Sequence, residues 1–165
     1  MDKTGFNQLM AHLRPKMYRF ALALVKRNDE ADDVVQDVGM TLWKRRADLS
    51  SVRNLEAYAM HAVKNRCTDY LRSRLNKTGE LCEALHVVHE HTPYASVEQA
   101  DTVAFVGKLI ERLPLQQQMV IRLRDIEGYE PDEIAEILDM NDSAVRANLS
   151  RARQKIREEL LKINI

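Results

Sequence analysis

Glycine, proline and cysteine are scarce in this chain of 165 residues. Five glycines and four prolines are too few for a fold built from short strands and tight turns, or for a low-complexity tail. The two cysteines, Cys67 and Cys82, do not make a disulfide framework and fit a reducing compartment. The longest apolar run, residues 20–25, is much too short to cross a bilayer. A disulfide-rich secreted domain and membrane insertion are therefore excluded.

Signatures of export and of catalysis are also missing. Residues 1–5 are not followed by an apolar stretch long enough for a signal peptide, so we expect a cytoplasmic protein. The chain has no glycine-rich phosphate loop, no nucleophile elbow and no helical His-Glu-x-x-His motif. We therefore predict that it is not an enzyme and needs no cofactor. The net charge is zero, with 25 basic and 25 acidic residues, so total charge alone does not suggest nucleic-acid binding.

What the sequence does contain is helical periodicity, and no convincing period-two strand appears. We predict an all-α fold of two small helical domains joined by a flexible linker. The first domain covers residues 1–75, the linker 76–95 and the second domain 96–165. The linker contains Gly79 and Pro93 and has no long apolar stripe.

Capping residues mark the expected helices of the first domain. Thr4 is a candidate N-cap for a short first helix, and Pro15 is expected to begin a second. Asn28 is expected to cap a helix that continues to about Trp43. After a loop over residues 44–53, Asn54 is predicted to cap a long helix that ends near residue 75.

The end of the chain has the layout of a helix-turn-helix. A short helix beginning at Pro131 is followed by a turn over residues 139–142 and a longer helix. Residues 143–157 hold five bases and no acid, whereas residues 130–138 hold four acids and no base. Positive charge is thus concentrated on the helix that would enter the DNA major groove. An ordinary helical hairpin with a solvated basic face is the alternative.

The residues of this last helix can be divided by their expected contacts with DNA. An apolar stripe faces inward, formed by Val145, Leu149, Ala152 and Ile156. We expect contacts to base edges from Ala147, Asn148 and Arg151, which project away from the stripe in the amino-terminal half. We expect contacts to phosphates from Arg146, Ser150, Arg153 and Lys155.

Charge is also sorted in the first domain. Residues 28–37 hold five acids and no base, and residues 44–77 hold nine bases against three acids. The functional interpretation is one face for a protein and one for nucleic acid. Helix-dipole matching on a solvated surface explains the same pattern, and this region alone leaves both interpretations open.

Three stretches together resemble the extracytoplasmic-function (ECF) sigma factors, the small two-domain class of bacterial sigma factors. Residues 29–37, followed by Leu42-Trp43, are similar to the family's polymerase-binding helix. Residues 57–72 are similar to its helix for the minus-ten promoter element. Residues 113–135, beginning with Leu113-Pro114, and residues 145–153, ending in the run from Leu149 to Arg153, are similar to its reader of the minus-thirty-five element.

The resemblance implies a sigma factor that binds core RNA polymerase and directs promoter-specific transcription initiation. It implies polymerase-binding residues Asp32, Asp33, Gln36 and Asp37, supported by Leu42 and Trp43. It implies minus-ten DNA-binding residues Arg53, Lys64, Asn65, Arg66, Asp69 and Arg72. It implies minus-thirty-five DNA-binding residues Ser143, Arg146, Ala147, Asn148, Ser150, Arg151, Arg153 and Lys155. An anti-sigma factor is a further partner that the family suggests.

The chain departs from the family pattern at three places. Gly39-Met40 replaces bulky residues, and a mid-helix glycine costs about 0.5–1 kcal/mol relative to alanine, so a bend is expected there. Asp139 replaces a turn glycine, and aspartate tolerates the left-handed conformation better than most residues. Ala144 replaces a hydroxyl residue and removes one possible phosphate contact.

Two other functions compete with the sigma factor. A free-standing helix-turn-helix regulator would need a dimer seam to bind two half-sites, and no extra helix is left to form one. A metal-dependent hydrolase or sensor would use Cys82, His86, His89 and His91 in the linker. Their spacing matches no standard metal motif, so we predict a polar linker and no bound metal.

Overall fold

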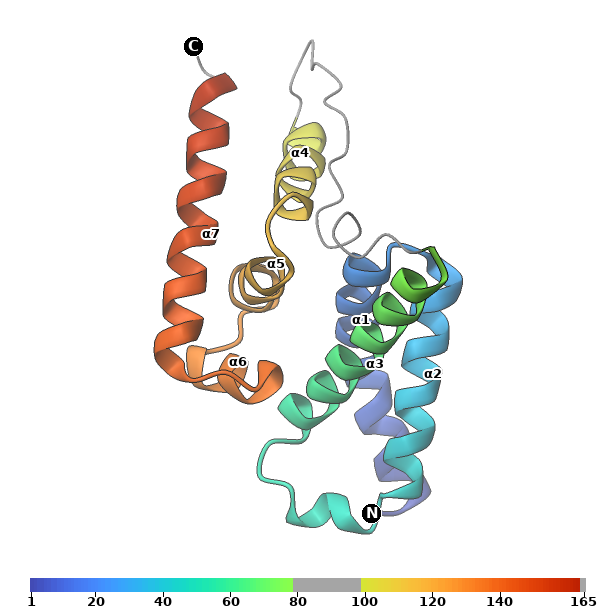
Figure 1. Cartoon of the computed structure of the whole chain (residues 1–165). Helices are drawn as coiled ribbons and strands as arrows, with labels where there is room; N and C mark the ends of the chain where they lie inside the picture. Colours follow the sequence, from blue (N-terminus) through green and yellow to red (C-terminus); the bar gives the residue numbers. More distant parts are fainter. Residues whose placement is uncertain (79–98, 164–165) are drawn as a thin grey trace. The chain divides into compact units, whose positions relative to one another are not determined.

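The computed structural model describes residues 1–78 and 99–163, and all regular secondary structure in these ranges is helical. Packing groups Met1–Thr78 with Asp132–Met140 as a first unit, and the rest of the described chain forms a second. In chain order (Figure 1) the elements are α1 (Lys3–Val25), α2 (Asn28–Lys44), η1 (Asp48–Ser51), α3 (Leu55–Thr78), α4 (Gln99–Glu111), α5 (Leu115–Ile121), η2 (Arg122–Ile126), α6 (Pro131–Leu138) and α7 (Asp142–Ile163). The predicted all-α class is confirmed.

Three helices form the core of the first unit, where α1 packs on both α2 and α3 and these two also pack on each other (Figure 1). Met17 and Phe20 of α1, Val34 of α2, and Met60 and Val63 of α3 are almost completely buried. Burial of large apolar side chains of this kind contributes about 1.5–3 kcal/mol each, so this cluster holds the three helices together.

The predicted division of the first segment into two helices is wrong, because α1 runs without interruption through Pro15. The N-cap is Asp2 rather than Thr4, and its carboxylate accepts a hydrogen bond from the backbone N–H of Gly5 at 2.9 Å. Proline inside a helix removes one backbone hydrogen bond. Leu13 and Met17 are fully buried on either side of it, so tertiary packing keeps the helix continuous.

The start of α2 also differs from the prediction. Asn28 is the first helical residue, and the N-cap position is Arg27, which makes no side-chain capping bond. The Asn28 side chain instead accepts a hydrogen bond from the Tyr18 hydroxyl at 3.1 Å. The predicted cap of α3 is confirmed, because Asn54 Oδ1 accepts from the backbone N–H of Ala57 at 3.0 Å.

The close approach of α1 and α2 explains Gly39. A Cβ placed at this position would lie 3.2 Å from Cε of Met10, a buried residue of α1. The missing side chain lets the two helices meet, and α2 continues through the glycine to Lys44.

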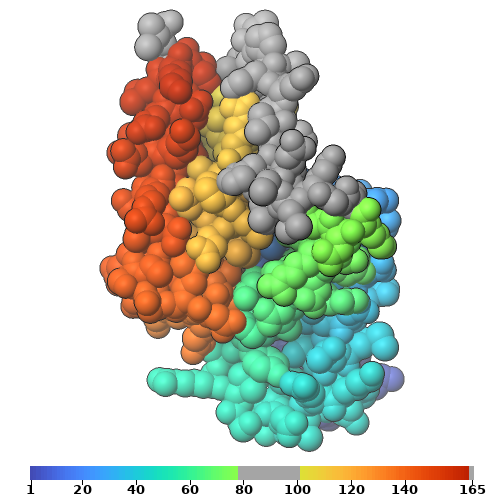
Figure 2. Space-filling view, in the orientation of Figure 1, coloured from blue at the N-terminus to red at the C-terminus, as the bar shows by residue number. Residues whose placement is uncertain are grey.

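In the second unit, α5 and α4 pack on α7. Figure 2 shows the yellow side chains of α4 and α5 lying against the orange-to-red side chains of α7. Leu109, Val120 and Leu123 are buried here, as is the predicted apolar stripe of α7. Asp139, which belongs to the first unit, has φ +55°, and this confirms the left-handed conformation expected before the last helix. Asn141 then caps α7, with its Oδ1 2.8 Å from the backbone N of Ala144.

Candidate functional site

The acidic face of α2 lies opposite its buried face. Asp32, Asp33 and Gln36 are exposed, whereas Ala31, Val34, Val35, Val38 and Leu42 are buried against the other helices of the first unit. These three exposed side chains are therefore available to a protein partner. Trp43 supports the end of the helix, because its ring packs edge-on against Phe6 at a centroid distance of 5.0 Å.

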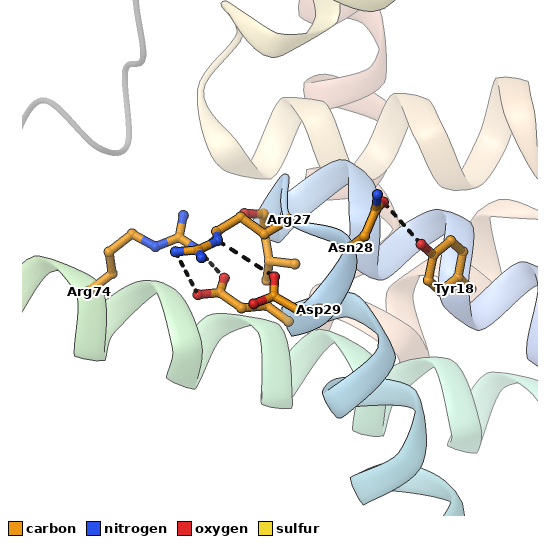
Figure 3. Close-up of polar contacts among 7 residues, drawn as sticks. Tyr18, Arg27, Asn28, Asp29 and Arg74 are labelled. Atoms are coloured by element: carbon orange, nitrogen blue, oxygen red, sulfur yellow. Dashed lines mark hydrogen bonds and ion pairs between the residues drawn. The ribbon is translucent and has the colours of Figure 1, made fainter.

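The first turn of α2 is held by basic side chains on both sides (Figure 3). Arg74 of α3 donates to the carboxylate of Glu30 and, at 3.1 Å, to the backbone carbonyl of Val25. Arg27 lies 3.6 Å from Asp29 and 3.9 Å from Glu30. Glu30 thus belongs to an internal network that ties the start of α2 to α3, and it is not part of the free acidic face.

The structure joins two residues that the sequence assigned to different partners. Nε and Nη2 of Arg66 donate to Oδ2 of Asp37 at 3.0 and 2.9 Å. The guanidinium also lies over the ring of Tyr70, 5.0 Å from its centroid. The hydrogen bond to Asp37 is the main cause that raises the pKa of Arg66. The acidic face of α2 and the basic face of α3 therefore meet in an ion pair.

Around this pair, α2 and α3 enclose an open groove. The α2 side contributes Asp37, Val38, Met40, Thr41 and Lys44, and the α3 side contributes Ala62, Asn65, Arg66 and Asp69. Asn65 and Asp69 are exposed, as is Arg72 one turn further along α3. Three predicted minus-ten residues, Asn65, Arg66 and Asp69, thus line one groove, and Arg72 lies further along the same helix.

The remaining two minus-ten residues are exposed to different extents. Arg53 is exposed in the segment before α3 and lines a second hollow with Tyr58. The Tyr58 hydroxyl accepts from Arg45 at 3.4 Å, so it is not confined to the core. The Lys64 side chain is only 15% exposed, which leaves it less accessible than Arg53.

The predicted DNA-binding residues of α7 are mostly exposed. Ser143, Arg146, Ser150, Arg151, Arg153 and Lys155 are exposed, and Ala147 and Asn148 are half-buried. One amide hydrogen of Asn148 is used within the helix, because Nδ2 donates to the carbonyl of Ala144 at 2.9 Å. That bond leaves Oδ1 and the second amide hydrogen of Asn148 unused, so the side chain keeps the capacity to bind a base edge.

Two flanks of α7 face different neighbours in the second unit. Arg151 and Lys155 border a pocket of about 270 Å³ whose other walls include Leu109, Arg112 and Gln117. On the other flank, Arg153 is bonded to Asp125 of η2 at 2.5 and 3.0 Å. Asp125 could not be predicted from the sequence, because it lies 28 positions before Arg153.

The cysteine and histidines proposed as an alternative metal site, Cys82, His86, His89 and His91, lie outside the described residues. Within residues 1–78 and 99–163, no group of three or more candidate ligands gathers at one point. No helix in those ranges combines the length and the apolar character needed to span a membrane.

Comparison with known protein families identifies both halves of the chain. The family model described as Sigma-70 region 2 matches residues 9–76, and the model described as Sigma-70, region 4 matches residues 106–156. The ECF sigma factor SigM of Mycobacterium tuberculosis is 24% identical over 94% of this chain and 76% of its own length. This chain belongs to the ECF sigma factors. The ECF sigma-E factor of Haemophilus influenzae is 28% identical over 96% of this sigma factor and 89% of its own length.

A longer relative and two solved structures also match this sigma factor. The sigma factor RfaY of Xanthomonas campestris is 26% identical over 95% of the chain, which spans only 40% of that relative. The fold matches RpoE of Bartonella quintana, solved with the anti-sigma factor NepR, with a TM-score of 0.75 and 23% identity over 98% of this chain and 99% of that one. It also matches CnrH, solved with the cytosolic domain of CnrY, with a TM-score of 0.71 and 23% identity over 99% and 92%.

Proposed function

We propose that this sigma factor binds core RNA polymerase and directs promoter-specific transcription initiation through minus-ten and minus-thirty-five elements. The observation that carries the proposal is that exposed acidic and basic surfaces lie on separate helices, within the two stretches that match sigma regions 2 and 4. We propose residues 1–75 as the polymerase and minus-ten domain, 76–95 as the linker and 96–165 as the minus-thirty-five domain. The chain would confer specificity without catalytic activity of its own, and would act in the cytoplasm.

The polymerase-binding surface is proposed to consist of Asp32, Asp33, Gln36 and Asp37. Its support is the exposure of the first three residues on one side of α2. Asp37 would contribute through Oδ1, because both bonds from Arg66 go to Oδ2. Such a surface suits a partner that carries basic side chains.

The two DNA-binding surfaces are proposed on α3 with the segment before it, and on α7. Unpaired promoter bases would enter the hollow beside Arg53 and Tyr58, while the groove with Asn65, Arg66 and Asp69 follows the strand. Flipping a base out of the stack costs a few kcal/mol, which fitted contacts must offset. On α7, Asn148 and Arg151 would bind base edges, and Ser143, Arg146, Ser150 and Lys155 would bind phosphates.

An anti-sigma factor is proposed as a further partner. The support is that two sigma factors with the same fold were solved in complex with NepR and CnrY.

Retention of promoter DNA tests the function directly. Labelled promoter fragments are incubated with the chain alone, with core polymerase alone and with both. We expect specific retention only with both, lost in Asp33→Lys and kept in Asp101→Lys, the same charge reversal at an exposed acid of α4 outside the proposed surfaces. Equal specific retention by the chain alone would instead identify a free-standing regulator.

A further inference from the structure

Arg153 differs from the other bases of α7 in its surroundings. The side chains of Arg146, Arg151, Lys155 and Arg157 make no hydrogen bond or ion pair with any residue that the structure describes. Arg153 donates from Nε to Oδ2 of Asp125 at 3.0 Å and from Nη2 to Oδ1 at 2.5 Å. This two-point geometry is the strongest arrangement available to an arginine and a carboxylate.

The backbone of η2 explains how Asp125 reaches this position. Here α5 widens into a π-helix, and the backbone N–H of Glu127 donates to the carbonyl of Arg122, five residues back, at 3.0 Å. The wider turn changes the direction of the side chains that it carries, and such turns are frequent at functional sites. Asp125 meets α7, while its neighbour Ile126 is left 54% exposed.

The position of Arg153 on α7 keeps it beside η2. It directly follows Ala152 and stands four residues after Leu149, both in the buried stripe. At 100° per residue, its side chain leaves the helix along the flank of the stripe rather than opposite to it. The hydrogen bond to Asp125 is the main cause that raises the pKa of Arg153, in agreement with a stable pair.

A phosphate at Arg153 would meet two obstacles. The Nε–Nη2 edge, which would bind a phosphate at two points, is already occupied by Asp125. The carboxylate would also face the phosphate, and like charges brought together oppose binding. Neither obstacle exists at Arg146, which is exposed.

We propose that Asp125 is a positioning residue for promoter recognition, holding α7 through Arg153, and that Arg153 binds Asp125 instead of a DNA phosphate. This rests on the proposed function, because it concerns how α7 is presented to the minus-thirty-five element. It adds a residue that no sequence feature singled out, and it replaces the phosphate contact expected for Arg153.

The salt dependence of promoter binding distinguishes an ion pair from a phosphate contact. Log K falls linearly with log salt concentration, and each phosphate contact adds about 0.9 to the magnitude of this slope, which is the quantity compared between variants. For the full chain with core polymerase, we expect Arg146→Ala to lower the slope by about 0.9. We expect Arg153→Ala to weaken binding about two- to five-fold with an unchanged slope, and adding Asp125→Ala to this variant to weaken binding no further. Circular dichroism checks that each variant remains folded.

Exchanging the charges of Asp125 and Arg153 provides a second, independent experiment. We expect Asp125→Arg and Arg153→Asp alone to reduce promoter binding, and the two together to restore it. A slope lowered by about 0.9 in Arg153→Ala, or a double exchange that remains as weak as Arg153→Asp, would overturn the proposal. A wild-type holoenzyme that binds no promoter refutes the proposed function, whereas these slopes concern Asp125 and Arg153 alone.

Discussion

Charge reversal at Asp33 and at Asp37 should affect polymerase binding alike but stability differently. The side chain of Asp33 is exposed and makes no hydrogen bond or ion pair with the described residues, whereas that of Asp37 accepts two hydrogen bonds from Arg66. Asp33→Lys therefore removes only an outward charge. Asp37→Lys also breaks an internal pair and places a second cation beside Arg66.

The size of the difference follows from the exposure of the pair. The two side chains are 43% and 42% exposed, so solvent screening limits the loss of the pair to about 0.2–1 kcal/mol. Two like charges 4 Å apart repel by about 1–4 kcal/mol, and the flexible lysine can turn into water, so the lower end applies. The total is about 1–2 kcal/mol, or roughly 4–16 °C in Tm for a domain of this size. Asp33→Lys should stay within about 0.5 kcal/mol.

Trp43 provides the assay, because it is the one tryptophan of the chain and lies at the end of α2. Its fluorescence during heating reports the first unit within the full chain, and a pull-down with core polymerase at low temperature reports binding. Both variants should lose the polymerase, and only Asp37→Lys should melt earlier. Equal melting curves would refute the energetic role of the Arg66 pair, and full polymerase binding by Asp33→Lys would refute the docking surface.

Three further predictions concern buried and DNA-facing positions. Burial raises the pKa of the Cys67 thiol from 9.0 to about 12, so the contribution of this thiol to the free energy of unfolding should be complete below pH 9 and fall as pH rises toward 12. Urea unfolding of a Cys82→Ser variant across this window measures that free energy. A profile that stays flat would contradict the prediction. Gly39→Leu should destabilise the first unit by about 1–3 kcal/mol, because the larger side chain crowds Met10. Gly39→Ala makes a smaller close contact with Met10, and a gain of about 0.5–1 kcal/mol in helix propensity offsets it. Equal Tm values for these two variants would show that the close approach is unimportant. Arg151→Ala should reduce transcription most at promoters with the native minus-thirty-five sequence, and an equal loss on every sequence would make Arg151 a phosphate contact.

The helices could be predicted from the sequence because their signals are local. Asn54 was recognisable as a cap, and the stripe from Val145 to Ile156 as the buried face of α7, since both depend on neighbours within a few residues. Pro15 misled the prediction for the opposite reason. Whether a proline ends a helix depends on the partners that pack around it, and Leu13 and Met17 are buried in a helix that packs on α2 and α3.

The charged surfaces of the candidate site could be predicted from the sequence, but the ion pairs within them could not. The separation of acids on α2 from bases on α3 and α7 is visible in the sequence, and exposure agrees with it at Asp33, Arg53 and Arg146. The pairs Asp37–Arg66 and Asp125–Arg153 span 29 and 28 residues, and they depend on how helices are placed in space. A count of charges treats all these residues as free, whereas the structure shows that some neutralise each other.

Run-off transcription over a library of randomised promoters, with and without the chain, tests the central claim most directly. With core polymerase and the chain together, we predict start sites preceded by two sequence elements at a fixed spacing, absent with core polymerase alone. Transcripts whose start sites are the same with and without the chain would contradict its assignment to promoter recognition.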